Sequence, residues 1–440
     1  MKFKLLAILF FLSISTAITY GQGEKYAQLG QFLDSLAAKE KFMGTFLLAE
    51  KGKPVFQKAV GLADQNSKKP MEIDSKLRIG SISKMFTSVL VFQAIEAKKL
   101  TLDQKLADFY PQLKNSESIS ISQLLQHRSG IFSVTDRMDY DAIRTKTHSE
   151  EELLSMMLEG GSVFDPDSKA EYSNSNFILL TFILQKVYGK SYTTLLQDQI
   201  LSPLGMKNTY VSGSIDVNKG EVKSYLPTGG WFEDKETSAT IPLGAGAITS
   251  STADLNTFIY GLFEGKLISK SSLEGILEFR DGYGRGIFSF PYYDKKSYGH
   301  TGGIDGFRSF LAYFPVEKVT LAVLSNGLNY NQNEILLAAL NTQFGKEWNA
   351  PDLNEIIVSE ELMKQYSGTY TSSQIPLQLT VKDVSGKISI QLTGQPQAVL
   401  EATSPHTFEL KAVGAVFIFD PENGQVTLKQ GTATIVFKKI

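Results

Sequence analysis

The sequence predicts a mixed α/β protein: one sheet built from both ends of a main domain, helices on its faces, an inserted helical subdomain, and a small antiparallel β-barrel or sandwich at the C-terminus. Strand-like runs lie near both ends of the main domain, whereas the stretch from about residue 100 to residue 210 carries mostly helical patterns. Beyond residue 361 the pattern changes to short alternating strands. A chain of 440 residues is too long for one ordinary core, because domains typically have ~100–200 residues.

The composition excludes several classes of protein. With 42% hydrophobic and 20% charged residues the chain is globular, and its net charge of -2 argues against a nucleic-acid partner. The absence of cysteine excludes disulfides, thiol nucleophiles and thiolate metal sites. No metal-binding motif and no phosphate-binding glycine loop is present, so we expect neither a metal nor a cofactor.

The N-terminus has the pattern of a secretory signal peptide over residues 1–21. Lys2 and Lys4 precede an apolar stretch, residues 5–18, which small residues follow. Spanning a bilayer needs ~20 apolar residues, so this stretch is short for an anchor, which is the alternative. No later stretch is long and uncharged enough to span a membrane. We therefore expect export to the periplasm or the exterior.

The first elements of the main domain, residues 22–350, are a helix and a hairpin. Apolar residues at helical spacing predict a helix over residues 28–39. Two β-rich runs, residues 44–49 and 54–60, are joined by the turn-forming Glu50-Lys51-Gly52-Lys53 and predict a hairpin. A long helical pattern follows Ser81.

The end of the main domain returns to strands. Strand-like runs occupy residues 284–290, 307–314 and 319–325. A helix is predicted over residues 333–343. In the tail, alternation around residues 377–381 and 388–392 and a hairpin at Asn423-Gly424 predict a separate barrel or sandwich over residues 357–440.

Ser81-Ile82-Ser83-Lys84 is the first candidate for chemistry. If a helix begins near Ser81, positions i and i+3 share a face and the lysine amine lies beside the serine hydroxyl. A serine hydroxyl is a weak nucleophile until a neighbour takes its proton, and lysine can take it if burial lowers its pKa. The alternative is an ordinary surface lysine on a helix.

Tyr172-Ser173-Asn174 is the second candidate. A tyrosine near a buried lysine can have a lowered pKa and pass a proton to a leaving group. Asn174 can hydrogen-bond both the lysine and a substrate carbonyl. The alternative is a helix N-cap, because serine and asparagine are favoured there.

His300-Thr301-Gly302-Gly303 is the third candidate. Glycines allow a backbone to pass close to a ligand, and an extended edge can bind a peptide by strand addition. The N–H of Gly303 could pair with that of Ser81 as an oxyanion hole. The alternative for His300 is a loop histidine with satisfied hydrogen bonds. His127, His148 and His406 are expected to be structural or solvated.

The order of these motifs resembles the class C β-lactamase-like, penicillin-binding serine hydrolases, a family that includes D-stereospecific peptidases and esterases. Tyr-x-Asn follows Ser81 by 91 residues (172 − 81), and His-x-Gly comes late in the chain. Further matching segments are Leu124-Leu125 before His127-Arg128-Ser129-Gly130, Pro203-Leu204-Gly205-Met206, and residues 244–251. The resemblance covers about residues 25–345, and the tail resembles the small lipocalin-like β-barrel of some members.

The resemblance implies a mainly antiparallel sheet, a site beside the helical subdomain, and a covalent acyl-enzyme on Ser81. Lys84 and Tyr172 would activate Ser81, while Asn174, His300, Gly303 and Arg308 would bind substrate. Dedicated β-lactamases usually have lysine at the position of His300, and a histidine there would be largely neutral near pH 7. Arg308 could bind a carboxylate instead, with a structural salt bridge as the alternative.

The sequence therefore predicts an exported serine hydrolase that acts on a small-molecule or peptide substrate. A D-amino-acid peptidase or DD-peptidase-like enzyme is favoured. The alternatives are an esterase, a weak class C-like β-lactamase, or a non-catalytic penicillin-binding or sensing protein. The oligomeric state is left open.

Overall fold

The computed structural model describes residues 24–227, 229–353, 356, 358–384, 386–410 and 413–440. The predicted signal peptide lies outside these residues. The chain forms two compact units, Met43–Tyr225 with Glu233–Gly327, and Met1–Phe42 with Leu226–Phe232 and Leu328–Ile440. The expected domain limits, 22–350 and 357–440, stay predictions.

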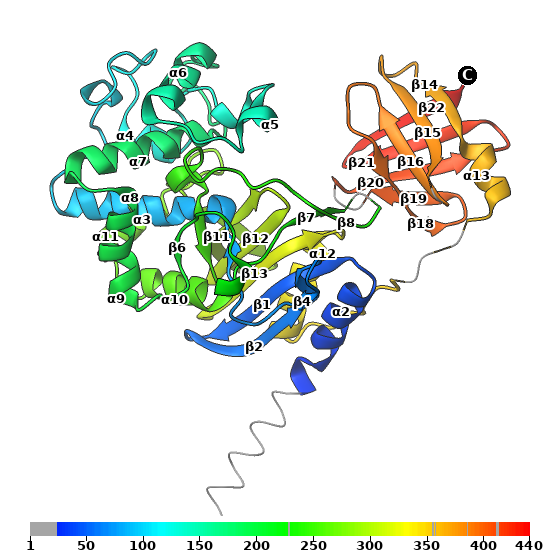
Figure 1. The fold of residues 1–440 in the computed structure, drawn as a ribbon, viewed down its shortest axis with the longest axis horizontal. Helices are drawn as coiled ribbons and strands as arrows, with labels where there is room; N and C mark the ends of the chain where they lie inside the picture. The colour runs from blue at the N-terminus through cyan, green and yellow to red at the C-terminus, as the bar shows by residue number, and fades with distance from the viewer. Residues whose placement is uncertain (1–23, 228, 354–355, 357, 385, 411–412) are drawn as a thin grey trace, which may run out of the picture. The chain divides into compact units, whose positions relative to one another are not determined.

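The larger unit is built on a six-stranded sheet of order β10-β11-β12-β13-β1-β2 (Figure 1). Its strands are β1 (Phe42–Glu50), β2 (Lys53–Val60), β10 (Phe288–Tyr292), β11 (Lys295–Ile304), β12 (Phe307–Phe314) and β13 (Val319–Leu328). The pairs β1–β2, β10–β11, β11–β12 and β12–β13 are antiparallel. Because β13 lies beside β1, strands from distant parts of the chain share one sheet, which confirms the predicted fold class.

Two almost wholly buried helices, α3 (Ser83–Glu96) and α7 (Asn174–Tyr188), form part of the core of the larger unit. Every residue of α3 from Ser83 to Phe92 is buried, and α7 is buried from Ser175 to Leu184. Helices that are apolar on all sides belong inside a core, and both contribute to the main apolar cluster. The helix predicted to follow Ser81 thus begins at Ser83, after the short 3₁₀ turn η1 (Gly80–Ile82).

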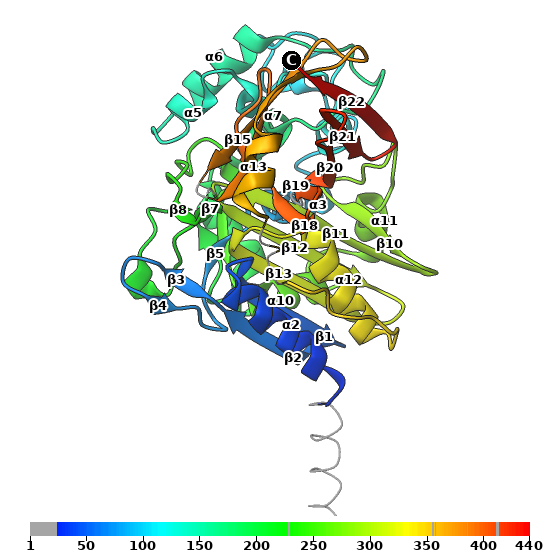
Figure 2. The ribbon, with the colours of Figure 1, turned by 90° about the vertical axis from the view of Figure 1, so that its right-hand side faces the viewer.

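Shorter helices surround α3 and α7. They are α4 (Ile121–Leu125), α5 (Tyr140–Ile143), α6 (Glu150–Gly160), α8 (Tyr192–Leu196), α9 (Ser202–Leu204), α10 (Thr252–Phe263) and α11 (Lys270–Ile276). In both views α5, α6 and α7 gather at the end of the unit away from β1 and β2 (Figures 1 and 2). This group is the predicted helical subdomain.

Further short strands form small sheets of two or three strands. β5 (Leu77–Arg78) and β6 (Tyr210–Val211) pair with β9 (Ile248–Ser250), β3 (Leu62–Asp64) pairs with β4 (Lys69–Pro70), and β7 (Tyr225–Pro227) pairs with β8 (Trp231–Glu233). The first of these sheets holds the segment that leads into Ser81.

The smaller unit contains α2 (Ala27–Ala38), α12 (Gln332–Gln343), α13 (Glu360–Tyr366) and a nine-stranded sheet. Its strands are β14 (Gly368–Thr371), β15 (Gln378–Val384), β16 (Lys387–Leu392), β17 (Ala398–Val399), β18 (Glu401–Ser404), β19 (Thr407–Leu410), β20 (Ala415–Asp420), β21 (Gln425–Gln430) and β22 (Ala433–Lys439). Pairing of β14 with β22 joins the first and last strands, so the sheet is a nearly closed barrel around its own apolar core. The predicted hairpin at Asn423-Gly424 is formed by β20 and β21.

Among the described residues, no helix has both the length and the apolar character needed to cross a bilayer.

Candidate active site

Ser81 lies on a sharp turn between β5 and α3, beside β11. Gly80 has φ +52, in the left-handed region that favours glycine. A Cβ on Gly80 would lie 2.7 Å from the backbone nitrogen of Gly303 in β11. Both the dihedral angle and this close approach therefore require glycine before the nucleophile. The carbonyl of Ile79 accepts a hydrogen bond from Ser309 Oγ at 2.7 Å, which ties the turn to β12.

Lys84 occupies the first turn of α3, and its amine faces Ser81. Lys84 Nζ lies 3.0 Å from Ser81 Oγ, 2.7 Å from Asn174 Oδ1 and 2.7 Å from the carbonyl oxygen of Ala245. The side chain has 0% exposure, and burial holds the pKa of Lys84 well below its ordinary value of 10.5. A neutral amine donates its two hydrogens to the two oxygen acceptors. Its lone pair then faces the hydroxyl of Ser81.

Tyr172 flanks Ser81 on the other side. Its phenol donates to Ser81 Oγ at 2.8 Å, and its ring centroid lies 4.8 Å from Lys84 Nζ. The expectation of a lowered pKa for this tyrosine is wrong, because burial raises the pKa of Tyr172 above 10. Tyr172 is therefore a protonated hydrogen-bond donor at neutral pH. The phenol, the hydroxyl and the amine form one directed chain.

Asn174 is the first residue of α7 and orients the amine. Its Oδ1 accepts from Lys84, and its Nδ2 donates to Thr135 Oγ1 at 2.8 Å. The N-cap position belongs to Ser173, whose side chain forms no capping bond. The alternative of a helix N-cap therefore holds for Ser173 by position, without a side-chain capping bond, whereas Asn174 lies inside the helix and contacts Lys84.

The strand β11 presents an open edge next to Ser81. Its partner β10 begins at Phe288, which pairs with Gly299, so among the described residues no strand pairs with residues 300–304 on that side. Ile304 and Phe307 pair with each other across a two-residue turn and exchange hydrogen bonds. In an antiparallel ladder only every second pair does so, and the next pair, Gly303 and Arg308, therefore does not. The N–H of Gly303, in the next pair, consequently points away from β12 and toward the Ser81 turn.

His300 is buried in this strand, with 2% exposure. Its Nδ1 donates to the carbonyl of Thr301 at 2.5 Å, and its ring centroid lies 4.7 Å from that of Phe288. Burial and the nearby Lys84 lower the pKa of His300 to about 3. The imidazole is thus neutral at pH 7 and supplies no fixed positive charge.

Arg308 lies opposite Gly303 in the β11–β12 register. Its Nη1 donates to the carbonyl oxygens of Asp305 at 3.0 Å and Phe307 at 2.7 Å. Within the described part of the chain it forms no ion pair, so the salt bridge that was the alternative is not found. Arg308 is an exposed residue of β12, but burial of its guanidinium lowers the pKa of the group.

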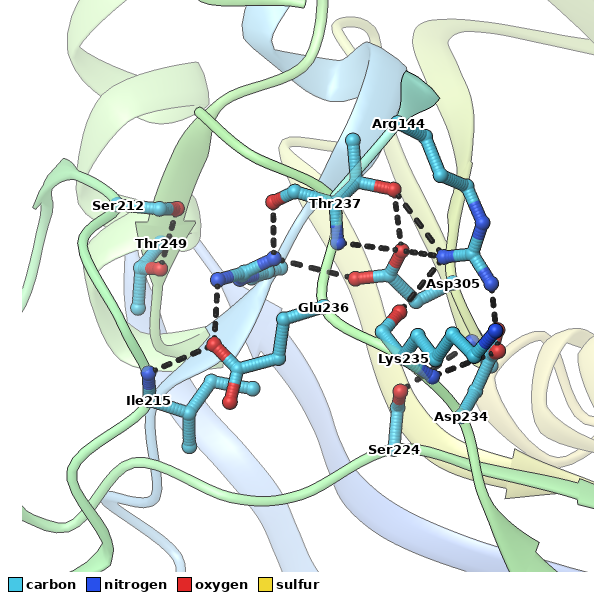
Figure 3. A network of polar contacts seen from close by, with 12 residues as sticks. Arg144, Ser212, Ile215, Ser224, Asp234, Lys235, Glu236, Thr237, Thr249 and Asp305 are labelled. Atoms are coloured by element: carbon cyan, nitrogen blue, oxygen red, sulfur yellow. Dashed lines mark hydrogen bonds and ion pairs between the residues drawn. The ribbon is translucent and has the colours of Figure 1, made fainter. Parts of the chain in front are cut away.

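Figure 3 shows an ionic network around Asp305 that the sequence did not reveal, and three of its residues, Arg144, Thr237 and Asp305, line the same cavity as Ser81. The carboxylate of Asp305, with 0% exposure, pairs with Arg78 at 3.1 Å and Arg144 at 2.9 Å. Its Oδ1 also accepts from the hydroxyl of Thr237 at 2.6 Å. Arg78 precedes the Ser81 turn and Asp305 follows Gly303, so this network joins the two segments on either side of the nucleophile.

An open cavity extends from Ser81 to this network. It is lined by Ser81, Thr135, Tyr140, Asp141, Arg144, Asn174, Asp234, Thr237, Pro242, Ala245, Gly246, Gly303, Ile304 and Asp305. Ligand sites are typically concave and carry a few placed polar groups. The cavity thus provides room for a substrate beside the hydroxyl of Ser81. In the described residues, no group of three or more histidines, aspartates or glutamates is arranged to hold a metal.

The close packing of β11 against the Ser81 turn gives the first prediction. A Cβ on Gly302 would lie 2.1 Å from the carbonyl oxygen of Ile79 and 2.2 Å from Ser309 Oγ. We expect Gly302→Ala to lower stability by roughly 1–3 kcal/mol, as overpacking does, and to lower turnover at least ~10-fold. Thermal unfolding and amide turnover measure the two effects.

The neighbouring Gly303→Ala is the matched control. A Cβ there meets nothing closer than 3.7 Å, and the backbone N–H is retained. Its turnover should stay within about fivefold of the parent, because the oxyanion donor is still present. Equal losses in both variants would show that this packing does not position the site.

Comparison with known proteins agrees with this geometry. The model of the Beta-lactamase family matches residues 31–346. Penicillin-binding protein 4* of Bacillus subtilis (strain 168) is 26% identical over 433 residues, covering 88% of this chain and 92% of that protein. Protein flp of Staphylococcus aureus (strain MW2) is 27% identical and covers 68% of this chain and 62% of its own length.

Solved structures share the fold. A D-amino acid amidase from Ochrobactrum anthropi SV3, complexed with D-phenylalanine, has a TM-score of 0.66 at 22% identity and covers 73% of this chain and 99% of its own. An octameric penicillin-binding protein homologue from Pyrococcus abyssi has a TM-score of 0.65 at 23% identity and covers 93% of this chain and 99% of its own. The matches confirm the family, the fold and the broad class, serine hydrolase, that the sequence predicts.

Proposed function

Since the chain belongs to the beta-lactamase family, we propose that it hydrolyses an amide or ester through a covalent acyl-enzyme on Ser81. The observation that carries this proposal is the chain of hydrogen bonds in which Ser81 Oγ lies 2.8 Å from the Tyr172 phenol and 3.0 Å from the Lys84 amine. A hydroxyl between a proton donor and a buried amine is arranged for attack on a carbonyl.

The acylation step follows from the protonation states. Lys84 takes the proton of Ser81 as Oγ bonds to the carbonyl carbon, because burial makes its neutral form available. The N–H groups of Ser81 and Gly303 stabilise the oxyanion that forms. The phenol of Tyr172, which keeps its proton at neutral pH, protonates the leaving group as its bond to the carbonyl carbon breaks.

The relay is then restored for the second step. Tyr172, having lost its proton, regains one from the protonated amine of Lys84, which lies beside its ring, and Lys84 is neutral again. Water then attacks the acyl carbon with the neutral amine of Lys84 as base, and the protonated amine returns that proton to Ser81 Oγ as its bond to the acyl carbon breaks. No metal or cofactor is required by these steps, and Asn174 holds the amine in place throughout.

D-amino-acid-containing peptides are the substrate class that we favour. The similar D-amino acid amidase of Ochrobactrum anthropi SV3 and a D-stereospecific amidohydrolase from Streptomyces sp. support this choice. The open edge of β11 can bind an extended peptide by strand addition. Neutral His300 offers no fixed charge for the carboxylate of a β-lactam.

Esterase activity and weak β-lactamase activity are the second candidate. The observation that favours β-lactam binding is Arg308, a guanidinium without an ion pair in the described chain, opposite Gly303. A purely sensing role is disfavoured because sensing needs no proton relay. The predicted signal peptide of residues 1–21 supports a periplasmic or secreted location.

Covalent labelling of the mature chain tests the proposal. Incubation with a fluorophosphonate, or with benzylpenicillin, should add the mass of one acyl or phosphonyl group to the peptide that contains Ser81. Turnover should then be measured on D-aminoacyl amides, acyl-D-Ala-D-Ala peptides, short esters and a chromogenic cephalosporin. An adduct on another residue, or labelling without turnover of any of these substrates, would reject the proposed enzyme.

A further inference from the structure

His127 is a buried histidine with no part in the steps above. It follows α4 and has φ +56, which is uncommon for a residue with a side chain. Its exposed fraction is 2%. Because a left-handed backbone and a buried polar ring are both unfavourable, compensating contacts must hold this residue in place.

Three of those contacts converge on Tyr172 and its two neighbours, and further ring contacts are made with Phe177 and Tyr283. The carbonyl oxygen of His127 accepts a hydrogen bond from the N–H of Glu171 at 2.9 Å. Its Nδ1 accepts from the N–H of Ser173 at 3.1 Å. Between these bonds, the imidazole stacks on the ring of Tyr172 with centroids 4.4 Å apart and planes 27° apart. One residue thus contacts three consecutive residues around the phenol.

The ring chemistry fits this position closely. Two donors, the N–H of Ser173 and the side-chain amide of Asn176, face Nδ1. Nδ1 is therefore unprotonated and acts as the acceptor, and the hydrogen of the neutral ring lies on Nε2. Burial together with Lys84 and His300 holds the pKa of His127 well below its ordinary value of 6.5. A flat neutral ring with an acceptor at this atom is what both the stack and the hydrogen bond need.

We propose that His127 is a positioning residue that holds the phenol of Tyr172 in line with Ser81 for proton delivery to the leaving group. This inference rests on the proposed function and deepens it. The stack fixes the plane of the phenol ring. The hydrogen bonds from the N–H groups of Glu171 and Ser173 to His127 fix the position of residues 171–173 relative to Ser81. Neither contact involves the side chain of Ser81 or Lys84, so we expect the hydroxyl and the amine to keep their positions when either contact is lost.

The prediction is a loss that depends on the leaving group. Two variants divide the contacts: His127→Phe keeps a ring and removes the acceptor, whereas His127→Asn keeps an acceptor and suits a left-handed backbone. For both we expect kcat/KM for D-alanine p-nitroanilide to fall by about 10- to 100-fold. The p-nitrophenyl ester of D-alanine needs no protonation of its leaving group, so its kcat/KM should fall by less than about threefold.

The ratio of the two rate constants is the decisive measurement. Misfolded protein lowers both activities equally, so the ratio does not depend on the fraction of folded enzyme. Tyr172→Phe should change the ratio in the same direction, and combining it with His127→Phe should add little, because both act on one step. His148→Asn, which removes an imidazole outside the site, is the control and should leave the ratio unchanged.

Two outcomes separate the possible failures. An unchanged ratio in both His127 variants, or full additivity with Tyr172→Phe, would overturn the positioning role while leaving the acyl-enzyme intact. Activity that persists without Ser81 would instead overturn the proposed function itself.

Discussion

Replacing Ser81 by alanine is expected to lower kcat/KM for amide and ester substrates by at least ~10⁴-fold. The hydroxyl is the only group of the relay that can bond to the substrate carbon, and without it Tyr172 loses its hydrogen-bond acceptor and the amine of Lys84 loses its hydrogen-bond donor. The fold should persist, because Ser81 lies on a turn whose geometry depends on Gly80 and on the Ser309–Ile79 hydrogen bond. Burst and steady-state kinetics with an ester reporter measure the loss.

Ser83→Ala is the matched control for this experiment. Ser83 lies two residues away on α3, and its Oγ accepts from the N–H of Ile248 at 3.2 Å without contacting Lys84. Its activity should stay within about tenfold of the parent. A Ser81→Ala enzyme that keeps more than about 1% of the parent activity, with no contaminating hydrolase, would disprove nucleophilic catalysis by Ser81.

Local patterns account for the parts of the site that the sequence predicted. Ser81 and Lys84 are three residues apart, so any helical backbone brings their side chains together. The motif at His300 lies within β11, and the motif at Tyr172 joins a loop to the first residue of α7, so each is a local pattern, and their order along the chain pointed to the family. The expected hairpin of β1 and β2 follows from alternation and turn residues in the same way.

Long-range burial accounts for what the sequence did not predict. The pKa of Tyr172 depends on the aromatic surroundings that shield its phenol, which come from several distant segments. The pairing of Asp305 with Arg78 joins positions 227 residues apart, and no local pattern marks it. The strand predicted from residue 284 begins instead at Phe288, because Gly286 has φ +78 in a tight turn before β10. Each of these facts is a property of the folded chain.

The amine of Lys84 carries the second large effect. Lys84→Met keeps much of the side-chain volume and removes the base, so we expect kcat/KM to fall by about 10³-fold, within the range of general-base catalysis. Lys84→Arg should be inactive at every pH, because a guanidinium stays protonated and cannot accept the proton of Ser81. Activity of the arginine variant close to that of the parent would show that positive charge, and not a neutral amine, is what the site requires.

The pH dependence of the parent enzyme follows from the same residue. Catalysis needs neutral Lys84, so kcat/KM should rise with pH through the lowered pKa of that amine and stay high until Tyr172 ionises above pH 10. The descending limb should disappear when Tyr172 is replaced by phenylalanine, and the ascending limb should disappear with Lys84→Met. The measurement is kcat/KM of the parent and of Lys84→Met over the same pH range, and the residual activity of the variant should not rise where that of the parent does.

Stability must depend on pH through the same burial. The folded protein holds Lys84 at a lowered pKa, whereas the unfolded chain binds its proton up to about pH 10.5. Between those two pKa values the unfolded state binds more protons than the folded state, so the parent loses stability as pH falls. Below the folded pKa both states bind the proton, and this loss of stability grows no further. Lys84→Met has no such group. As pH decreases from about 10.5, the Tm of the parent should therefore fall relative to the Tm of Lys84→Met. Parallel Tm curves over this range would mean that Lys84 is charged in the folded protein, and a charged lysine could not take the proton of Ser81.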